Sequence, residues 1–205
     1  MQKSEDLRVK RTRKMLRDAL VELVEEQGFE SITVTDLAER AMINRATFYR
    51  HYRDKEDLFK RCIDEAVEDL AQVAESVIYE LRDRATLADA LYYILLADFN
   101  YLAENADFGR VMLGRDVPAA VAARIRDYLM KLGKHHAELF DLPIDQGRMP
   151  YDVSLSFSAA GYIGAMSWWL ENEMPYSPEE MARYVSFVAI YGVYAARNWE
   201  FKPKQ

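Results

Sequence analysis

The side chains best suited to recognition chemistry lie together in one short segment. Arg45 and Arg50 can donate hydrogen bonds to phosphate or, in bidentate fashion, to guanine. Thr47 can bond a base edge or a phosphate, and Ala46 is small enough to touch a thymine methyl group. Tyr49 can reach a phosphate through its hydroxyl. The segment therefore predicts direct reading of double-stranded DNA.

A second set of residues could hold the sugar–phosphate backbone without reading bases. Residues 1–17 contain seven basic and two acidic residues and form a basic arm, although the whole chain carries a net charge of -7. Residues 1–60 hold 13 of the 27 Lys and Arg and 12 of the 34 Asp and Glu, so the acidic excess lies in the rest of the chain. The expected backbone contacts are Arg8, Arg11, Thr33, Thr35, Asn44, His51 and Lys55.

Three helix starts position these side chains. Thr33 begins a capping box, and Asn44 and Asp54 are good N-caps for the helices that follow them. Two short helices joined by a tight turn form the helix-turn-helix pattern, whose second helix enters the major groove of DNA. Phe48 and Tyr52 lie four residues apart and are expected to anchor that second helix to the core.

Hydrophobic periodicity predicts an all-α fold of about nine helices. Residues 1–60 are expected to form a three-helix helix-turn-helix domain that binds DNA. Residues 61–205 are expected to form a helical-bundle domain for regulation, ligand binding and dimerisation. The expected helices span about 8–27, 33–42, 45–51, 55–81, 86–104, 106–113, 118–140, 152–173 and 178–200.

The run Leu37–Phe59, LAERAMINRATFYRHYRDKEDLF, closely resembles the DNA-binding signature of the TetR family of transcriptional regulators. The resemblance implies that Tyr49 and Lys55 hold the DNA backbone, and that a small-molecule effector releases a repressor from its operator. It also implies that bases are read by Arg45, Ala46, Thr47 and Arg50. Met42 stands where the family often has a turn glycine, which predicts a turn that is slightly strained or differently shaped. Ala46 also replaces a common glycine.

The C-terminal part carries a less detailed resemblance. Residues 161–172, GYIGAMSWWLEN, together with 175–181, look like a branch of the family that includes regulators of dihydroxyacetone kinase genes. Aromatic and methionine side chains suit an apolar pocket with a few hydrogen-bonding groups, and the resemblance implies an effector site among them. The expected pocket residues are Tyr92, Phe99, Met112, Tyr128, Tyr162, Met166 and Trp169.

The last two expected helices are candidates for a homodimer interface. Small residues in 152–173 allow close helix approach, and 178–200 presents large apolar side chains. The uncharged run 153–170 is therefore interpreted as a helix buried in an interface rather than a membrane span. An intramolecular core is the alternative for this pair of helices. The expected interface residues are Ser158, Gly161, Ala165, Phe187, Tyr191 and Ala195.

Other classes of function are disfavoured. The sequence has no Gly-rich phosphate loop, HExxH or GxSxG motif, so no enzyme activity or cofactor is expected. The single cysteine, Cys62, and the polar start predict a cytoplasmic protein without an internal disulfide. Adjacent His135 and His136 point about 100° apart on a helix, so no metal site is expected. The open alternative is a DNA-binding protein whose C-terminal domain binds a protein partner instead of a small molecule.

Overall fold

The computed structural model describes residues 2–81, 86–114, 119–139 and 149–194. These residues form nine α-helices, a 3₁₀ turn and a π-helical segment, which confirms the all-α fold expected from the sequence. The elements are α1 (Gln2–Gln27), η1 (Phe29–Ser31), α2 (Val34–Arg40), α3 (Arg45–His51), α4 (Lys55–Leu81), α5 (Leu87–Glu104), α6 (Ala106–Leu113), α7 (Ala119–Leu139), α8 (Tyr151–Glu171), α9 (Pro178–Phe187) and the π-helical η2 (Val188–Tyr194).

Capping side chains set the helix starts that the sequence predicted. The Thr33 hydroxyl accepts a hydrogen bond from the backbone N–H of Asp36 at 3.2 Å, and the Asp36 carboxylate accepts one from the Thr33 N–H at 2.8 Å. The Asn44 side chain accepts from the N–H of Thr47 at 2.7 Å, and Asp54 caps α4 in the same way. Each cap satisfies an N–H that has no partner within its helix. As a result α3 and α4 begin where the sequence predicted; α6, which has no side-chain cap, also has the predicted bounds.

Some helix ends differ from the prediction. The basic arm is helical, because α1 already begins at Gln2. Helix α2 ends at Arg40, short of the expected end near Met42, because Met42 itself adopts a left-handed backbone with φ 51°. The last expected helix is α9 only as far as Phe187 and continues as η2, while the remainder of 178–200 lies outside the described residues. A π-helical turn is rare and often marks a functional site.

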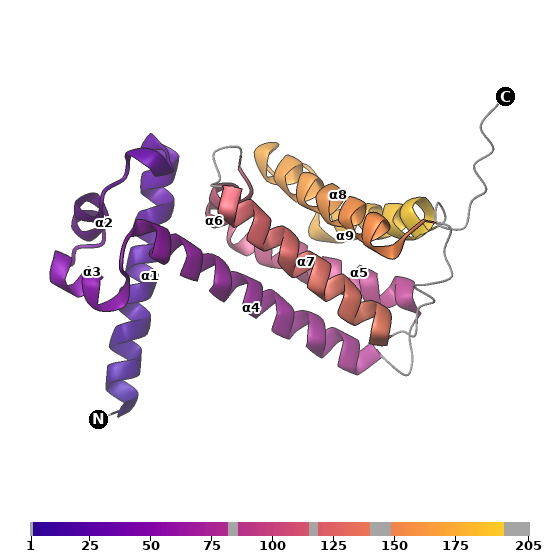
Figure 1. Ribbon diagram of the computed structural model, residues 1–205, viewed down its shortest axis with the longest axis horizontal. Coiled ribbons are helices and arrows are strands. Elements are labelled where there is room, and N and C mark those ends of the chain that lie inside the picture. Colours follow the sequence, from indigo (N-terminus) through magenta and orange to yellow (C-terminus); the bar gives the residue numbers. More distant parts are fainter. Residues whose placement is uncertain (1, 82–85, 115–118, 140–148, 195–205) are drawn as a thin grey trace.

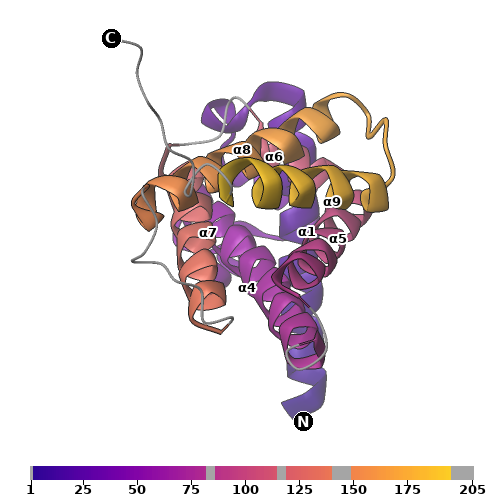
Figure 2. The same ribbon diagram turned by 90° about the vertical axis from the view of Figure 1, so that its right-hand side faces the viewer.

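Helices α1 to α3 form a unit at one end of the molecule, and α4 leads from it into a larger bundle (Figure 1). In the bundle, α4 contacts α5 and α7, α8 contacts α6 and α7, and α9 contacts α5. Figure 2, viewed from the opposite end, shows α8 and α9 crossing over the other helices of the bundle. The chain connection between the two parts is therefore a single continuous helix.

One hydrophobic core joins the two parts. Leu16, Leu20 and Phe48 from the N-terminal unit belong to the same buried cluster as Phe108 of α6 and Ile125 of α7. A second cluster lies within the bundle, around Phe99, Trp169 and Met181. A movement of α6 or α7 would therefore displace side chains of the N-terminal unit, because close-packed interiors transmit strain. The domain boundary proposed after residue 60 falls inside α4.

The uncharged run 153–170 forms most of α8, which buries Ser154, Ala159, Met166, Trp169 and Leu170 against the bundle. Within the described ranges, no helix has both the length and the apolar character needed to cross a membrane.

Candidate functional site

Helix α3 presents a polar face to solvent and rests on an aromatic anchor. Phe48 is 0% exposed, with its ring centroid 5.8 Å from that of Tyr52 and 5.6 Å from that of Tyr49. Tyr49 is 52% exposed, and Arg45, Ala46 and Arg50 are also exposed, whereas Thr47 is half-buried. The structure therefore brings the predicted base-reading residues together on one outward face of α3.

The turn between α2 and α3 is strained in the way the sequence predicted. Met42 has φ 51° with a side chain that is 85% exposed, so its packing contributes little to offset the left-handed backbone. For a residue with a Cβ atom, this conformation costs roughly 1–2 kcal/mol.

We expect Met42→Gly to raise the free energy of unfolding by about 0.5–1 kcal/mol. Glycine removes the cost of the left-handed backbone. It also lowers stability by roughly 0.4–1 kcal/mol, because it increases the conformational freedom of the unfolded chain. Urea denaturation measures the change. Met42→Ala retains the Cβ atom and should stay close to wild type, and a glycine variant less stable than wild type would show that the turn is not strained.

Several expected backbone contacts have structural roles in the free protein. Thr33 and Asn44 use their side chains as the helix caps described above. Lys55 donates from Nζ to the carbonyl oxygens of Phe29 and Glu30, each at 2.9 Å, and its Nζ lies 4.8 Å from the centroid of the Phe29 ring. The ammonium of Lys55 thus ties the start of α4 to η1, which precedes the helix-turn-helix.

The remaining expected backbone contacts differ in exposure. Arg8 and Arg11 are exposed on α1, while Thr35 and His51 are half-buried. Burial, followed by the neighbouring charges of Arg13 and Arg50, lowers the pKa of His51. His51 is therefore neutral in the free protein near pH 7, and a phosphate placed beside it would favour its protonation.

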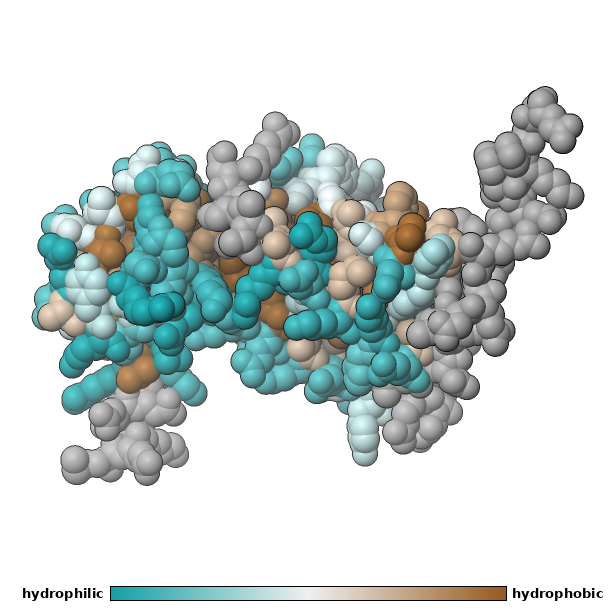
Figure 3. Space-filling view, in the orientation of Figure 1, coloured by the Kyte–Doolittle hydropathy of each residue, from teal (hydrophilic) through white to brown (hydrophobic). Residues whose placement is uncertain are grey.

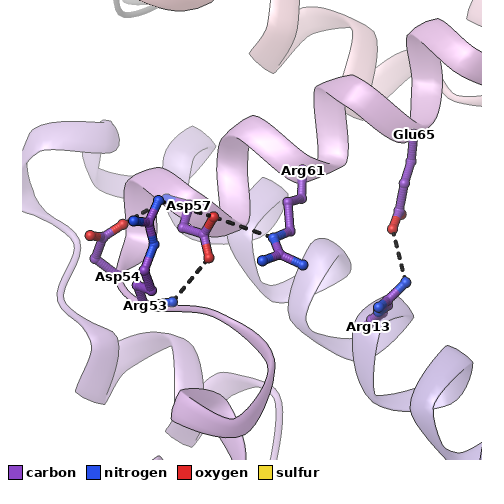
Figure 4. Close-up of polar contacts among 6 residues, drawn as sticks. All are labelled: Arg13, Arg53, Asp54, Asp57, Arg61 and Glu65. Carbon is purple, nitrogen blue, oxygen red and sulfur yellow. Dashed lines mark hydrogen bonds and ion pairs between the residues drawn. The ribbon is translucent and has the colours of Figure 1, made fainter.

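A network at the start of α4 holds α4 to the preceding turn and to α1 (Figure 4). The buried carboxylate of Asp57 accepts from the backbone N–H of Arg53 at 3.0 Å and from Arg61 Nε at 3.3 Å. These bonds, the first of them most strongly, lower the pKa of Asp57. Arg13 on α1 pairs with Glu65 on α4 at 3.4 Å. The N-terminal unit and α4 are therefore connected by polar contacts as well as by their shared core.

In the helical bundle that follows the N-terminal unit, a cavity of about 430 Å³ lies between α5, α7, α8 and α9. Small-molecule pockets commonly occupy roughly 300–1,000 Å³. Most of the lining is apolar, Asp98 is the acidic residue in it, and none of the described lining residues is basic. The pocket therefore suits an apolar ligand body.

A smaller cavity of about 40 Å³ adjoins it, bounded by residues of α4, α5, α6, α7 and α8. Asp98, Leu129 and Tyr162 line both cavities. The Tyr162 hydroxyl donates to Oδ2 of Asp98, whose side chain is only 7% exposed. Burial raises the pKa of Asp98 to about 7, and the bond from Tyr162 opposes that rise. The Tyr128 hydroxyl is buried and has no hydrogen-bond partner among the described residues.

The predicted pocket residues fall into three groups. Tyr162 lines both cavities, and Met112, Tyr128 and Met166 line the small one. Phe99 and Trp169 belong to the bundle core, with their ring centroids 5.2 Å apart, and Tyr92 packs against that core. The sequence analysis missed Asp98. Its signal was a lone carboxyl within the apolar run 91–102, LYYILLADFNYL.

The described interface residues lie on α8, at the end of α9 and on η2, and those on α8 line the large cavity. Ser158, Gly161 and Ala165 line that cavity, and a Cβ atom added at Gly161 would meet no atom within 4 Å. Phe187 and Tyr191 are exposed. Ala195 lies outside the described residues. In Figure 3, hydrophobic residues gather where Figure 1 places α8.

The described residues contain no group of three or more His, Cys, Asp or Glu side chains arranged to hold a metal ion. His135 is exposed, and the side chain of His136 lies outside the described part of the chain.

Comparison with known proteins connects this geometry to a family. Residues 16–62 match the bacterial regulatory proteins of the tetR family, and residues 89–190 match a transcriptional regulator C-terminal region. An HTH-type transcriptional repressor of Mycobacterium tuberculosis is 30% identical over 156 residues, covering 74% of this chain and 82% of that protein. An uncharacterized HTH-type transcriptional regulator of Bacillus subtilis is 43% identical over 63 residues, which cover 30% of this chain but only 17% of that longer relative.

Solved structures share the fold. A putative TetR-family regulator from Syntrophomonas wolfei aligns with a TM-score of 0.73 and 15% identity, covering 90% of this chain and 96% of that one. The transcriptional regulator FadR of Bacillus subtilis, solved in complex with stearoyl-CoA, aligns with a TM-score of 0.64 and 18% identity, covering 87% and 98%. The family matches and the mycobacterial relative agree with the helix-turn-helix seen in α2 and α3. This chain therefore belongs to the TetR family of DNA-binding transcriptional regulators.

Proposed function

We propose that the protein is a cytoplasmic, homodimeric repressor that leaves its operator when a small molecule enters the cavity of about 430 Å³. One observation carries the proposal. The small cavity beside the larger one is lined by Phe108, Met112 and Ile125, which belong to the same buried core as Phe48 of α3. The small cavity and the DNA-reading helix thus share a continuous packed core.

On DNA, we assign base reading to Arg45, Ala46, Thr47 and Arg50 of α3. Tyr49, which is exposed at the edge of that face, contacts phosphate. Arg8 and Arg11 on α1 add affinity that depends on salt, because their charges displace counterions from DNA. The caps formed by Thr33 and Asn44 and the tie made by Lys55 hold the two helices in place, and Thr35 and His51 lie beside them for further phosphate contacts.

For dimerisation, we assign the surface formed by α8, α9 and η2. Val153, Phe157, Phe187, Val188 and Tyr191 are all exposed large hydrophobic residues on these elements. Contiguous exposed apolar surface is characteristic of interaction sites. A two-fold axis through this surface would place two copies of α3 against two half-sites of a palindromic operator.

Release of DNA follows from movement of α4 and α6. Residues of α4, such as Leu70, line the small cavity. Arg17 of α1 connects α1 to α6. It donates to Asn105, the residue before α6, at 3.0 Å, and its Cζ lies 4.1 Å from the centroid of the Phe108 ring. Ligand binding that displaces these helices would change the spacing of the two α3 helices. Half-sites roughly 34–36 Å apart tolerate little such change.

The cavity supports a small-molecule effector over a protein partner as the regulator. FadR of Bacillus subtilis was solved with stearoyl-CoA and FadR of Thermus thermophilus with lauroyl-CoA. An apolar chain of that kind would suit the lining of the large cavity here. We also propose that residues 161–181 resemble the branch with dihydroxyacetone kinase gene regulators. The division into a DNA-binding domain, 1–60, and a regulatory domain, 61–205, is part of the same proposal.

Gel-shift titration of the purified protein on DNA from upstream of its own gene tests the assignment, at fixed salt with non-specific competitor. Arg45→Ala should weaken the specific complex by about tenfold to a hundredfold and alter base preference, because a bidentate contact to guanine discriminates by roughly 1–3 kcal/mol. Tyr49→Phe should weaken binding to all sequences alike.

Arg126→Ala is the matched control, since Arg126 is exposed on α7, away from α3. This variant should bind like wild type. An Arg45→Ala protein that lost the same affinity for every sequence would contradict the base-reading role of Arg45. If an effector is proven to bind the protein and the affinity for DNA does not fall when it is added, the release mechanism is contradicted.

A further inference from the structure

Asp98 occupies an unusual position for a carboxyl group. It lies where the two cavities meet, surrounded by apolar side chains of α5, α7 and α8. Its Oδ2 accepts from Tyr162, but its Oδ1 accepts no hydrogen bond from the described residues. No Lys, Arg or His is among the described residues that line either cavity. Within the described part of the chain, this buried acid thus has no positive partner.

A buried carboxylate without a counter-ion is costly, and proteins normally pair it or keep it protonated. A ligand that carried a positive charge to Oδ1 would supply the missing partner and form a charge-assisted hydrogen bond. A ligand carboxylate or phosphate in the same place would instead be repelled. A single carboxyl in this position would therefore discriminate among head groups, while the apolar walls would suit many ligand bodies.

The neighbouring Tyr128 supports this placement. Its hydroxyl is buried without a partner among the described residues, and it lines the small cavity together with Asp98 and Tyr162. An ammonium group has three N–H donors, so it could bond Asp98 and the Tyr128 oxygen at once. The small cavity, at about 40 Å³, has room for a group of about the size of a water molecule.

We propose that Asp98 selects the effector of this protein as an apolar molecule bearing one protonated amine, whose cationic group binds Oδ1 at the junction of the two cavities. The inference rests on the proposed small-molecule regulation. Asp98 is then a specificity-determining residue, and Tyr162 is a positioning residue that fixes the orientation of its carboxyl group.

Isothermal titration calorimetry with decylamine, decanol and decanoate, below their aggregation concentrations, tests the proposal. The three probes share one apolar chain and differ only in the head group. At neutral pH the wild-type protein should bind decylamine about tenfold to a hundredfold more tightly than decanol, as expected for a hydrogen bond to a charged group, and decanoate most weakly. Equal affinities, or tighter binding of decanoate, would overturn the proposal.

Asp98→Asn should abolish the preference for the amine while leaving decanol affinity unchanged. Asp127→Asn is the matched control, because Asp127 is an exposed carboxylate on α7, and it should keep the wild-type preference. Tyr162→Phe removes the hydrogen bond that orients the Asp98 carboxyl and should lower the amine preference without abolishing it; an unchanged preference in this variant would contradict the positioning role of Tyr162. An amine preference that survives in folded Asp98→Asn would contradict the role of Asp98.

A proton measurement separates ligand contact from a purely structural role. The other titratable groups lining the two cavities are tyrosines, from α5, α7, α8, α9 and the segment before α9, and these stay neutral near pH 6. Because the pKa of Asp98 is about 7, decylamine binding at roughly pH 6 should release a proton in wild type but not in Asp98→Asn. Release of the same proton by the variant would overturn the assignment.

These outcomes distinguish failure of the selection by Asp98 from failure of the proposed small-molecule site. Binding of all three probes without preference would leave the small-molecule site standing and remove only the selection by Asp98. Failure of every probe to bind would overturn the selection and also count against the small-molecule site in the proposed function.

Discussion

Replacement of Phe48 by alanine is expected to destabilise the protein by about 3–5 kcal/mol and to abolish specific DNA binding. Phe48 is 0% exposed and belongs to the core that joins the N-terminal unit to α6 and α7. Helix α3 has only 7 residues, too few to be stable without tertiary packing. Loss of the anchor should therefore disorder the face that carries Arg45 and Arg50. Urea denaturation measures the first effect and gel shift the second.

Tyr79→Ala provides the control for removal of an aromatic ring. Tyr79 is 79% exposed on α4, so this variant should stay within about 0.5 kcal/mol of wild type and bind DNA normally. A Phe48→Ala protein with nearly wild-type stability, or with unchanged operator affinity, would contradict the anchoring role of Phe48.

Asp98→Asn should make the protein more stable than wild type at mildly alkaline pH, by up to about 4 kcal/mol. Burial raises the pKa of Asp98 from 3.8 to about 7 in the folded state. Between these two values the unfolded chain loses the proton and the folded protein keeps it, so the free energy of unfolding of the wild type falls as pH rises. Asparagine does not titrate and avoids this loss. The gain of the variant should thus grow from about pH 4 and level off above about pH 7.

Urea denaturation of both proteins at several pH values measures this difference. Subtraction of the two curves removes the contributions of all other titrating groups. Asp127→Asn, which alters an exposed carboxylate on α7, is the control for the change from a carboxylate to an amide. A flat difference for Asp98→Asn would mean that this carboxyl is ionised in the folded protein throughout, and the description of its site would be wrong.

The parts of the fold that depend on local sequence could be predicted well. Asn44 and Asp54 set the starts of α3 and α4 by accepting hydrogen bonds from backbone N–H groups three residues later. Such local caps can be recognised in a sequence from the residue type alone. The outward face of α3 followed from the four-residue spacing of Phe48 and Tyr52. Strain at Met42 was predictable only through the family resemblance, because Met42 stands where the family often has a turn glycine, and the structure gives it φ 51°.

Features that depend on tertiary packing could not be predicted. The Nζ of Lys55, whose expected phosphate contact stays a prediction, bonds in the free protein two carbonyl groups about 25 residues earlier in the chain, which the sequence does not indicate. Phe99 and Trp169 were chosen as aromatic pocket residues, but their positions on facing helices place them in the core. Asp98 became a candidate only when α5, α7 and α8 were seen to surround it. Composition does not distinguish a filled core from a cavity, since both use the same side chains.

In the proposed mechanism, α3 reads operator DNA as one of a two-fold related pair. Selection of binding sites from a random duplex pool, at physiological salt and followed by sequencing, tests it most directly. The account predicts an enriched inverted repeat whose half-sites lie about 34–36 Å apart or a multiple of that distance. Recovery of sequences with no shared motif, or of a single unpaired half-site, would contradict it.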